Sequence, residues 1–336
     1  MRGTLKKFTA LIAAGILCLP LSACSPRSES CEFFAMDTYM TITAAGGETE
    51  DALREAQQAV FAMERRLSAT DGESEIARLN AGESVQISGD TAALLSRALE
   101  LAGASAGTFD PTVRPLMELW GFTTEEYRVP SAEEIEATMA LTGWEKVECK
   151  GTEVVLAPGQ KLDLGGIAKG WASETICDIL RSHGVESALL YLGGSVQTLG
   201  TKADGSPWRV GVQNPDGSDE HLGILSVGEC AVVSSGGYQR FFEADGVRYH
   251  HILDPRTGRP AQSGLAAVTV VCADAVAADA YSTALYVMGL DAALDFWRGH
   301  SGELELVLCT DEGGLYITGG LEGMFRSDRP FEVVRK

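Results

Sequence analysis

The chain has 336 residues and is acidic, with 47 Asp and Glu against 27 Lys and Arg and a formal net charge of −20 at pH 7. Such a surface repels nucleic acid and anionic lipid headgroups, which excludes nucleic acid as a partner. A hydrophobic content of 45% supplies enough apolar side chains for one large α/β domain or two domains in close contact.

The N-terminus has the pattern of a targeting segment. Basic residues stand among the first seven positions, an apolar run over 8–19 follows, and the segment ends at Leu21-Ser22-Ala23-Cys24. The apolar run is too short to span a bilayer as a stable helix. The last four residues resemble the lipobox of bacterial lipoproteins, and a plain secretory signal cleaved near the same place is the alternative.

From this resemblance we expect residues 1–23 to be a removable signal peptide and Cys24 to be the lipid-carrying first residue of the mature protein. Residues 24–32 would form a tether, and 33–336 the folded domain. The lipid chains would hold the protein on the extracytoplasmic face of the cell membrane. The acidic surface would add no electrostatic attraction to anionic lipids. The membrane is therefore expected as a partner only through the lipid anchor.

The first third of the mature chain is mainly helical in pattern. Before the helices, 33–43 alternates like a strand and is interrupted at 36–38, where the backbone could approach a ligand. A plain edge strand is the alternative. Three amphipathic helices follow, one over 51–69, one capped by Ser74 and ending at 79, and one capped by Asp90.

Residues 107–122 read GTFDPTVRPLMELWGF and begin as a loop. Asp110-Pro111 forces an extended bend, and Phe109 is an aromatic residue in that loop with little local reason to be buried. Phe109 could stack on a flat ring, or it could be a plain hydrophobic plug. Beyond this loop, a capping box of Ser131 and Glu134 predicts a helix to about 141, and a hairpin is expected over 144–156.

Ten residues at 161–170, KLDLGGIAKG, combine an acid, a flexible turn, a base and a helix start. Two leucines flank Asp163 in the alternation of a half-buried strand, two glycines free the backbone to turn, and a helix is expected from Gly170. The unpaired N–H groups and the positive end of the helix dipole, with Lys169 beside them, would make a cradle for phosphate. An ordinary strand-to-helix turn with a surface lysine is the alternative.

Several strands in the second half end in Gly or Ser turns, where open α/β sheets place ligands. A hairpin expected over 241–251 leads into HHILDPRTGRP at 250–260. In a strand His250 and His251 face opposite ways, so at most one of them faces a given site. A histidine beside a carboxylate can act as a general base near neutral pH. A structural turn held by Asp254 is the alternative.

The last informative segment is a buried strand over 268–272 followed by a helix from Ala275, with Asp274 as its predicted N-cap. Asp279 and Thr283 are four residues apart and therefore lie on one face of this helix. A carboxylate and a hydroxyl are hard oxygen ligands suited to Mg²⁺. In the alternative, Thr283 bonds back to the carbonyl of Asp279 on a plain polar face.

Eight short motifs follow one another along the chain. They are MDT at 36–38, RLS with SEIARLN within 66–80, TFDPTVRPLMELWGF at 108–122, LDLGGIAKG at 162–170, LGGS at 192–195, SSGGY at 234–238, HILDPRTG at 251–258 and ADAYSTAL at 278–285. This set resembles the ApbE-type flavin transferases from about Phe33 to Phe325. The departures are small: Asp37, Thr108 and Trp171 stand where glycine, alanine and tyrosine are common.

The resemblance implies an α/β (α+β) fold of T-fold type, a single large domain with a mixed sheet and flanking helices. It also implies an enzyme, an FAD:protein FMN transferase. Such a transferase takes FAD as its substrate, moves FMN onto a Ser or Thr hydroxyl of an acceptor protein with the help of Mg²⁺, and releases AMP.

The family's site residues carry over onto matching positions of this chain. Mg²⁺ would be held by Asp279, Thr283 and the backbone carbonyl of Gly166. His251 would be the base for the acceptor hydroxyl, so His251 and Asp279 are the expected catalytic residues. The expected FAD contacts are Met36, Thr108, Phe109, Asp110, Asp163, Lys169 and His251.

Two other functions remain open on the sequence. A Mg²⁺-dependent FAD pyrophosphatase, which cleaves FAD to FMN and AMP, would use the same residues with water in place of the acceptor hydroxyl. A non-catalytic, lipid-anchored flavin-binding protein would leave Asp279 and His251 without a role. For the transferase, the expected acceptors are extracytoplasmic subunits of membrane redox pumps or flavin-bearing electron-transfer domains.

Overall fold

The structure is a computed structural model and describes residues 28–218 and 220–336. The expected signal peptide, Cys24 and the first residues of the expected tether lie outside these ranges. Within them, no helix has both the length and the apolar character needed to cross a membrane.

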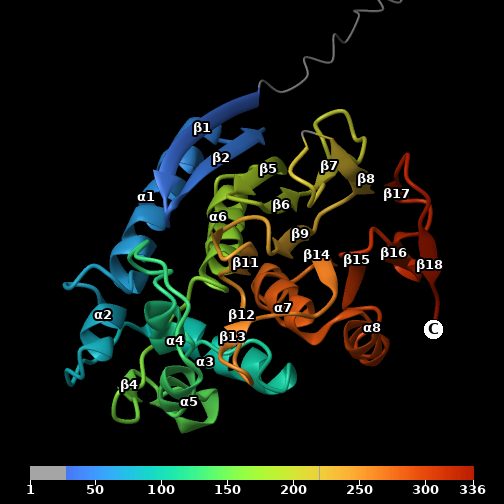
Figure 1. Cartoon of the computed structure of the whole chain (residues 1–336). Coiled ribbons are helices and arrows are strands. Elements are labelled where there is room, and N and C mark those ends of the chain that lie inside the picture. Colours follow the sequence, from blue (N-terminus) through green and yellow to red (C-terminus); the bar gives the residue numbers. More distant parts are fainter. Residues whose placement is uncertain (1–27, 219) are drawn as a thin grey trace, which may run out of the picture.

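A nine-stranded sheet runs through the molecule (Figure 1). Its spatial order is β1 (Ser28–Ala35), β2 (Thr38–Ala45), β5 (Ser187–Leu192), β6 (Ser195–Leu199), β9 (Ala231–Gly236), β14 (Leu265–Cys272), β15 (Leu304–Thr310), β16 (Leu315–Thr318) and β18 (Glu332–Val334). Neighbours are antiparallel except β16 and β18, which are parallel. β2 illustrates the period of two, because Met40 and Ile42 are buried while Thr41 and Thr43 face the other side.

Three long helices lie along one face of this sheet (Figure 1). They are α1 (Thr49–Leu67), α6 (Ala168–Ser182) and α7 (Ala275–Met288). α1 packs on α6, α6 packs on α7, and α7 lies on β9 and β14. The buried residues of α1 recur every three or four positions from Ala52 to Leu67, as an amphipathic helix requires. The expected mixed sheet with flanking helices is confirmed.

The opposite, outer face of the sheet is covered only in part. A small sheet packs on the half formed by β6, β9, β14 and β15, where Val232 and Val271 join its core. The outer sides of β1, β2 and β5 remain open, since Phe34, Tyr39 and Tyr191 are exposed there. The small sheet consists, in spatial order, of β17 (Phe325–Arg326), β8 (His221–Val227) and β7 (Trp208–Gln213).

The elements that follow α1 and precede α6 in the chain gather at the end of the molecule away from β1 and β2 (Figure 1). They are α2 (Glu75–Asn80), α3 (Gly89–Ala104), α4 (Arg114–Leu119), α5 (Ala132–Met139), η1 (Trp144–Lys146), β3 (Glu148–Lys150) and β4 (Glu153–Val155). An apolar cluster on Leu116, Trp120 and Phe122 ties α4 to Ile135 of α5 and to Leu253 near the histidines.

The remaining elements follow β9 and α7 in the chain. They are β10 (Phe241–Ala244), β11 (Val247–His250), β12 (Leu253–Asp254), β13 (Arg259–Pro260), α8 (Leu290–Gly299) and η2 (Gly319–Leu321). The hairpin expected over 241–251 is confirmed as β10 and β11. The predicted caps Ser74, Ser131 and Asp274 are also confirmed. The cap of α3 is Ser88, however, and Asp90 lies in the first helical turn.

The single interrupted strand expected over 33–43 is wrong, because this segment is a hairpin. β1 and β2 pair antiparallel around Met36 and Asp37, whose φ angles are 51° and 58°. Two successive left-handed residues give a turn that matches the twist of paired strands. β1 also begins at Ser28, so the tether expected over 24–32 loses its last five residues to the sheet.

The strand expected around Asp163 is also wrong. The flanking leucines are buried, as the alternation predicted, but the segment pairs with no strand in the described structure. Instead, the side-chain amide of Asn80 bonds both the N–H and the carbonyl of Leu162, at 2.7 and 2.9 Å. One side chain thus replaces the neighbouring strand as the partner of the buried backbone. α6 begins at Ala168, two residues before the predicted start.

Candidate active site

A cleft of about 370 Å³ opens at the ends of β2, β5 and β9 and is closed by α6, α7 and the loop before α4. It brings together nine of the ten residues predicted to hold the metal or FAD. Its lining includes Thr108, Phe109, Asp110, Asp163, Gly166, Lys169, His251, Asp279 and Thr283.

Met36 is the exception among the predicted residues. Its side chain packs against the core, its backbone N–H donates to Glu64 Oε1 at 2.6 Å, and its neighbour Asp37 faces the cleft instead. Met36 and Asp37 face different surroundings because a hairpin turn points consecutive side chains in different directions. The cleft lining therefore includes Asp37, which departs from the family pattern, and the expected contact of Met36 with FAD stays a prediction.

Asp279 is the most enclosed charged group of the cleft, with 3% of its surface exposed. Its Oδ2 accepts the backbone N–H of Gly170 at 2.9 Å, and its Oδ1 lies 3.4 Å from Lys169 Nζ. Lys169 Nζ also donates to the carbonyl of Gly165 at 3.3 Å. The positive end of α6 is thus directed at a carboxylate of this chain. The phosphate cradle expected at this helix start stays a prediction, and Asp279 is a part of it that the expectation did not include.

Gly170 allows this arrangement because α6 and α7 approach each other closely there. A Cβ atom at position 170 would lie 2.3 Å from the carbonyl oxygen of Ala275, which is a backbone clash. Two helix starts therefore meet without side chains between them, and the carboxylate of Asp279 reaches across the gap. Close backbone approach is one of the few reasons for glycine inside a helix.

Thr283 presents its hydroxyl to the cleft. The back-bond to the carbonyl of Asp279 comes from Ser282, whose Oγ donates at 2.8 Å, while Thr283 Oγ1 lies 3.4 Å from Ser235 Oγ. The alternative, in which Thr283 bonds back to the carbonyl of Asp279, is therefore wrong. Asp279 Oδ1 and Thr283 Oγ1 lie one helical turn apart on the cleft side of α7. Both are hard oxygen donors of the kind that Mg²⁺ prefers.

His251 faces the cleft and His250 faces away from it, as their adjacent positions predicted. His250 is buried, with Nε2 donating to the carbonyl of Ala261 at 3.0 Å, and it lines a second cavity of about 500 Å³. His251 Nδ1 lies 3.1 Å from the carbonyl of Arg240. Because a carbonyl only accepts, Nδ1 carries the proton and Nε2 has a free lone pair.

The surroundings of His251 keep its imidazole neutral. Removal from water lowers its pKa to about 4, and the nearby positive charges of Arg240 and Lys169 act in the same direction. The backbone hydrogen bond to Arg240 opposes this shift only in part. A neutral ring with a free Nε2 can accept a proton throughout the physiological pH range.

Phe109 and Asp110 form one wall of the cleft. Phe109 is buried with its ring over Gly166, where an added Cβ would lie 3.2 Å from Cε2. Asp110 accepts three hydrogen bonds, from the N–H and hydroxyl of Thr112 at 2.8 and 2.6 Å and from the N–H of Trp144 at 3.2 Å. Burial nonetheless raises the pKa of Asp110. Its contacts identify Asp110 as the residue that holds this loop in place.

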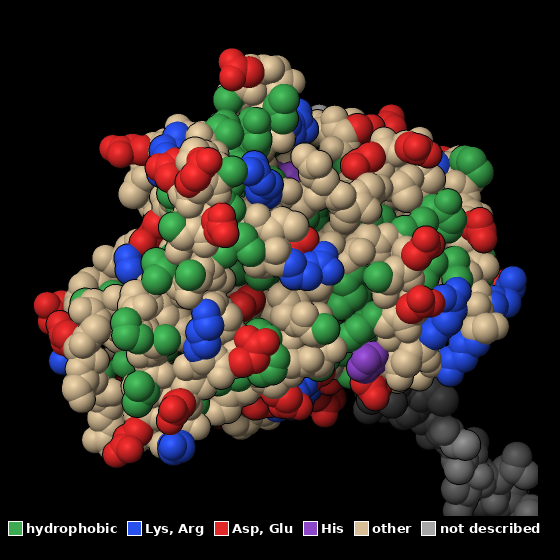
Figure 2. Space-filling view, turned by 60° about the horizontal axis from the view of Figure 1, so that its bottom comes forward, with side chains coloured by type: hydrophobic (Ala, Val, Ile, Leu, Met, Phe, Trp, Pro, Cys, Tyr) green, Lys and Arg blue, Asp and Glu red, His purple; other side chains and the backbone are tan. Residues whose placement is uncertain are grey.

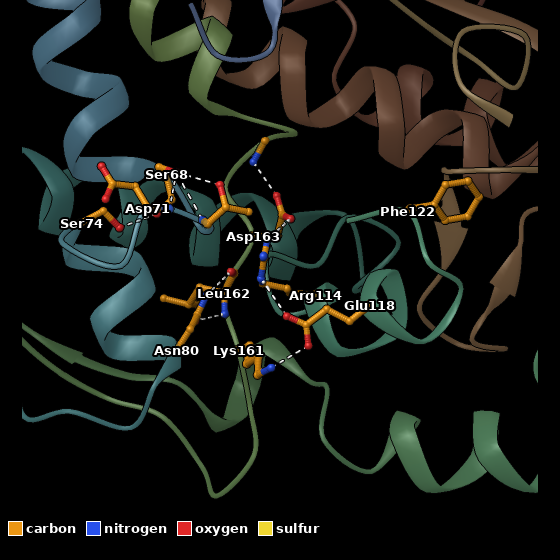
Figure 3. A network of polar contacts seen from close by, with 12 residues as sticks. Ser68, Asp71, Ser74, Asn80, Arg114, Glu118, Phe122, Lys161, Leu162 and Asp163 are labelled. Carbon is orange, nitrogen blue, oxygen red and sulfur yellow. Dashed lines mark hydrogen bonds and ion pairs between the residues drawn. The ribbon is translucent and has the colours of Figure 1, made fainter. Parts of the chain in front are cut away.

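Arg114 is a cleft residue that sequence reasoning missed. Figure 3 shows it between two carboxylates, with Nη1 3.3 Å from Asp163 Oδ2 and Nε 3.2 Å from Glu118 Oε1. Glu118 Oε2 in turn pairs with Lys161 Nζ at 2.6 Å, and Asp163 Oδ1 accepts the N–H of Gly165 at 2.9 Å. The i,i+4 spacing of Arg114 and Glu118 in an apolar run was the available signal.

Further missed residues come from the β9 end and the segment after it. Ser234 and Ser235, Gln239 and Arg240 all line the cleft. Arg240 also donates to the carbonyl of Phe122, which joins this wall to the α4 region. The motif SSGGY had marked the place, but side-chain direction after the strand end could not be derived from it.

The comparisons with known proteins agree with this geometry. The model of the ApbE family matches residues 36–308. The FAD:protein FMN transferase of Vibrio cholerae is 35% identical over 248 residues, covering 72% of this chain and 74% of that protein. The FAD:protein FMN transferase of Treponema pallidum is 34% identical over 285 residues, with 79% of each chain covered.

Solved structures show the same likeness in three dimensions. The crystal structure of the ApbE protein from Thermotoga maritima superimposes with a TM-score of 0.83 at 35% identity, covering 90% of this chain and all of that one. The match therefore includes the elements that build the cleft, and this chain belongs to the ApbE family.

Proposed function

We propose that the protein is an FAD:protein FMN transferase that moves FMN from FAD to a Ser or Thr hydroxyl of an acceptor protein and releases AMP. One observation supports this proposal above the others. The same cleft is lined by Asp279, Thr283, Lys169 and His251. Phosphoryl transfer depends mainly on positioning and charge neutralisation, so a metal site, a lysine and one base form a sufficient set.

The donor set of the cleft fits a magnesium ion. Asp279 Oδ1 has the ammonium of Lys169 nearby at 3.4 Å, and Thr283 presents its hydroxyl one turn further on. We propose that these two oxygens and the carbonyl of Gly166 hold Mg²⁺, with substrate and water completing its shell. When bound, the ion would neutralise charge on the FAD pyrophosphate.

In the proposed reaction the phosphoanhydride bond of FAD is broken and a phosphate ester bond to the acceptor is formed. The acceptor hydroxyl gives its proton to His251 Nε2, its oxygen bonds to the phosphorus of the FMN part, and the bond from that phosphorus to the AMP oxygen breaks. AMP leaves with the bonding electron pair. The neutral imidazole suits this role, because its Nδ1–H is already held by the carbonyl of Arg240.

The other cleft residues would position the substrate. Lys169 lies where it offsets pyrophosphate charge, and Asp163 is fixed by Arg114 and by its bond from Gly165 N–H. Phe109 offers an apolar surface beside Gly166. These residues orient FAD while the reacting groups come from α7 and from the end of β11.

The products distinguish transfer from its alternatives. The purified protein is incubated with FAD, MgCl₂ and candidate extracytoplasmic acceptor domains, and the products are analysed by intact-mass spectrometry and nucleotide chromatography. The proposal expects a mass increase equal to one FMN and an equal amount of AMP. If AMP and free FMN appear without an adduct, the protein is an FAD pyrophosphatase. If neither AMP nor an adduct appears, the protein only binds flavin.

We also propose that Cys24 carries the lipid that anchors the protein to the extracytoplasmic face of the membrane. The support is the lipobox sequence that ends at Cys24. Cys24→Ser should move the protein from the membrane fraction to the soluble fraction and abolish palmitate labelling. Unchanged membrane association in that variant would contradict the anchor.

A further inference from the structure

The outer face of the main sheet has two halves with different surroundings. The half on β6, β9, β14 and β15 is covered by the small sheet of β7, β8 and β17. The half on β1, β2 and β5 is open and carries large aromatic side chains. Phe34, Tyr39 and Tyr191 are 63%, 53% and 47% exposed, which ranks them among the most exposed large hydrophobic residues of the described chain.

Strand register places these three side chains on the same face of the sheet, and they are here called the aromatic row. Phe34 stands directly opposite Tyr39 across β1 and β2. Tyr191 stands opposite Thr41, which lies two residues beyond Tyr39 on the same face of β2. Tyr191 is therefore diagonal to Tyr39, and the three side chains are spread over three neighbouring strands that lie about 4.8 Å apart. An aromatic surface of this kind is typical of the centre of a protein–protein interface.

Two residues of the aromatic row lie close along their strands to residues that line the cleft. Tyr39 follows the cleft residue Asp37 by two positions, and Tyr191 precedes the cleft residue Gly193 by two. A protein that inserts a hydroxyl into the cleft must approach residues such as Asp37 and Gly193, and the aromatic row begins two positions from them. We propose that the acceptor protein docks on the outer face of β1, β2 and β5 through the aromatic row, an inference that rests on the proposed function.

The charges around the row indicate the kind of partner. The strands β1, β2 and β5 contain no Lys or Arg, whereas Glu29 and Glu32 stand on β1 and Asp37 at the turn. The face in Figure 2 is reached by turning the bottom of Figure 1 toward the viewer. It also carries scattered acidic side chains, with basic ones singly or in small groups among them. The acceptor surface is therefore apolar at its centre and neutral or basic at its rim, and anionic lipid is disfavoured as an occupant.

The test uses Phe34→Thr and Tyr191→Thr, singly and together, in the full chain. Threonine suits an exposed strand position, so the sheet should be kept. Val155→Thr is the matched control, because Val155 is 61% exposed on β4 (Figure 1), at the opposite end of the molecule from the row. Thermal unfolding and the KM for FAD check that fold and cleft are unchanged. The acceptor is whichever extracytoplasmic domain the unsubstituted protein loads with FMN.

The double variant should raise the KM for the acceptor domain about tenfold or more. The KM for FAD and the kcat at saturating acceptor should stay within about twofold, and the control should resemble the unsubstituted protein. An unchanged acceptor KM in the double variant would overturn the docking proposal while FMN transfer itself still stands. The proposal would also be overturned if the substitutions changed only vesicle binding or self-association. If the unsubstituted protein transfers FMN to none of the acceptor domains, the proposed function is wrong, and the docking proposal that rests on it is wrong as well.

Discussion

The two sides of the cleft are held by different physical means. On one side, α6 and α7 meet backbone to backbone at Gly170, and Asp279 bridges them from a fully helical position. On the other side, the segment that contains Asp163 has no regular structure and is held by ion pairs and by the amide of Asn80. Packing thus fixes Asp279, a proposed metal ligand, whereas charge and hydrogen bonds fix Asp163, a residue proposed to orient FAD.

The difference has a consequence for mutation. A group on packed helices keeps its position to within a fraction of an ångström, which catalysis at a metal requires. A loop held by ion pairs can shift when one charge is lost, since each partner then finds itself half-buried without its counterion. Substitutions on the helix side should reduce the chemical step, and those on the loop side should mainly weaken substrate binding.

Asp279→Asn should have the largest effect. The amide oxygen can still accept the N–H of Gly170, so the helices should stay together, but the negative charge beside Lys169 is lost. We expect kcat for FMN transfer to fall by about a thousandfold, with little change in the free energy of unfolding. Product mass and denaturant unfolding measure the two quantities. Full activity in this variant would exclude Asp279 from the metal site.

His251→Gln should come next, with a loss of kcat of about a hundredfold or more, the range expected for a general base. In the unsubstituted protein the pKa of about 4 predicts a constant rate near neutral pH and a decline as the pH approaches that value, where Nε2 becomes protonated. The rate is measured from pH 4.5 to 8 with a stable fold checked at each point. A midpoint near 6.5 would show that His251 is in water-like surroundings.

The same pKa shift affects stability with a definite sign. The unfolded chain binds a proton at His251 below about pH 6.5, whereas the folded protein does so only near 4. The contribution of this group to stability is therefore complete above pH 6.5 and is lost as the pH falls toward 4. In His251→Gln this part of the pH dependence of the free energy of unfolding should vanish.

Gly170→Ala tests the packed side directly. The added methyl group meets the carbonyl of Ala275, so the helices must separate, and we expect a loss of about 1–3 kcal/mol in the free energy of unfolding. The kcat should fall as Asp279 moves. Gly89→Ala is the control, since Gly89 also stands in the first turn of a helix, α3, but an added Cβ there meets no atom within 4 Å. Equal unfolding energies for the two variants would contradict the close approach.

Arg114→Met should give the smallest effect on the chemical step. Asp163 and Glu118 would lose their shared partner, and the KM for FAD should rise about tenfold while kcat changes by less than about threefold. Arg128→Met is the control, because its ion pair with Glu134 is exposed and contributes little. A fall in kcat with an unchanged KM would show that the loop side takes part in the chemistry itself.

Much of the site could be predicted because its chemistry is local in the sequence. Asp279 and Thr283 are one helical turn apart, and the facing of His250 and His251 follows from the period of a strand. The turn at Met36 was read as a strand interruption because the two differ by only two φ angles. Arg114 was missed because an arginine beside a proline in an apolar run gives no indication that it will be buried.

The sequence by itself determined the order of the motifs, the periods of the main helices and strands, and the set of groups proposed to bind a metal, a phosphate and a proton. Only the tertiary structure decided how 161–170 is used. Its helix start is directed at Asp279, 109 positions later in the chain, and its expected strand is held by one asparagine. Periodicity reports which face of an element is apolar, whereas contacts between distant segments depend on how whole elements pack.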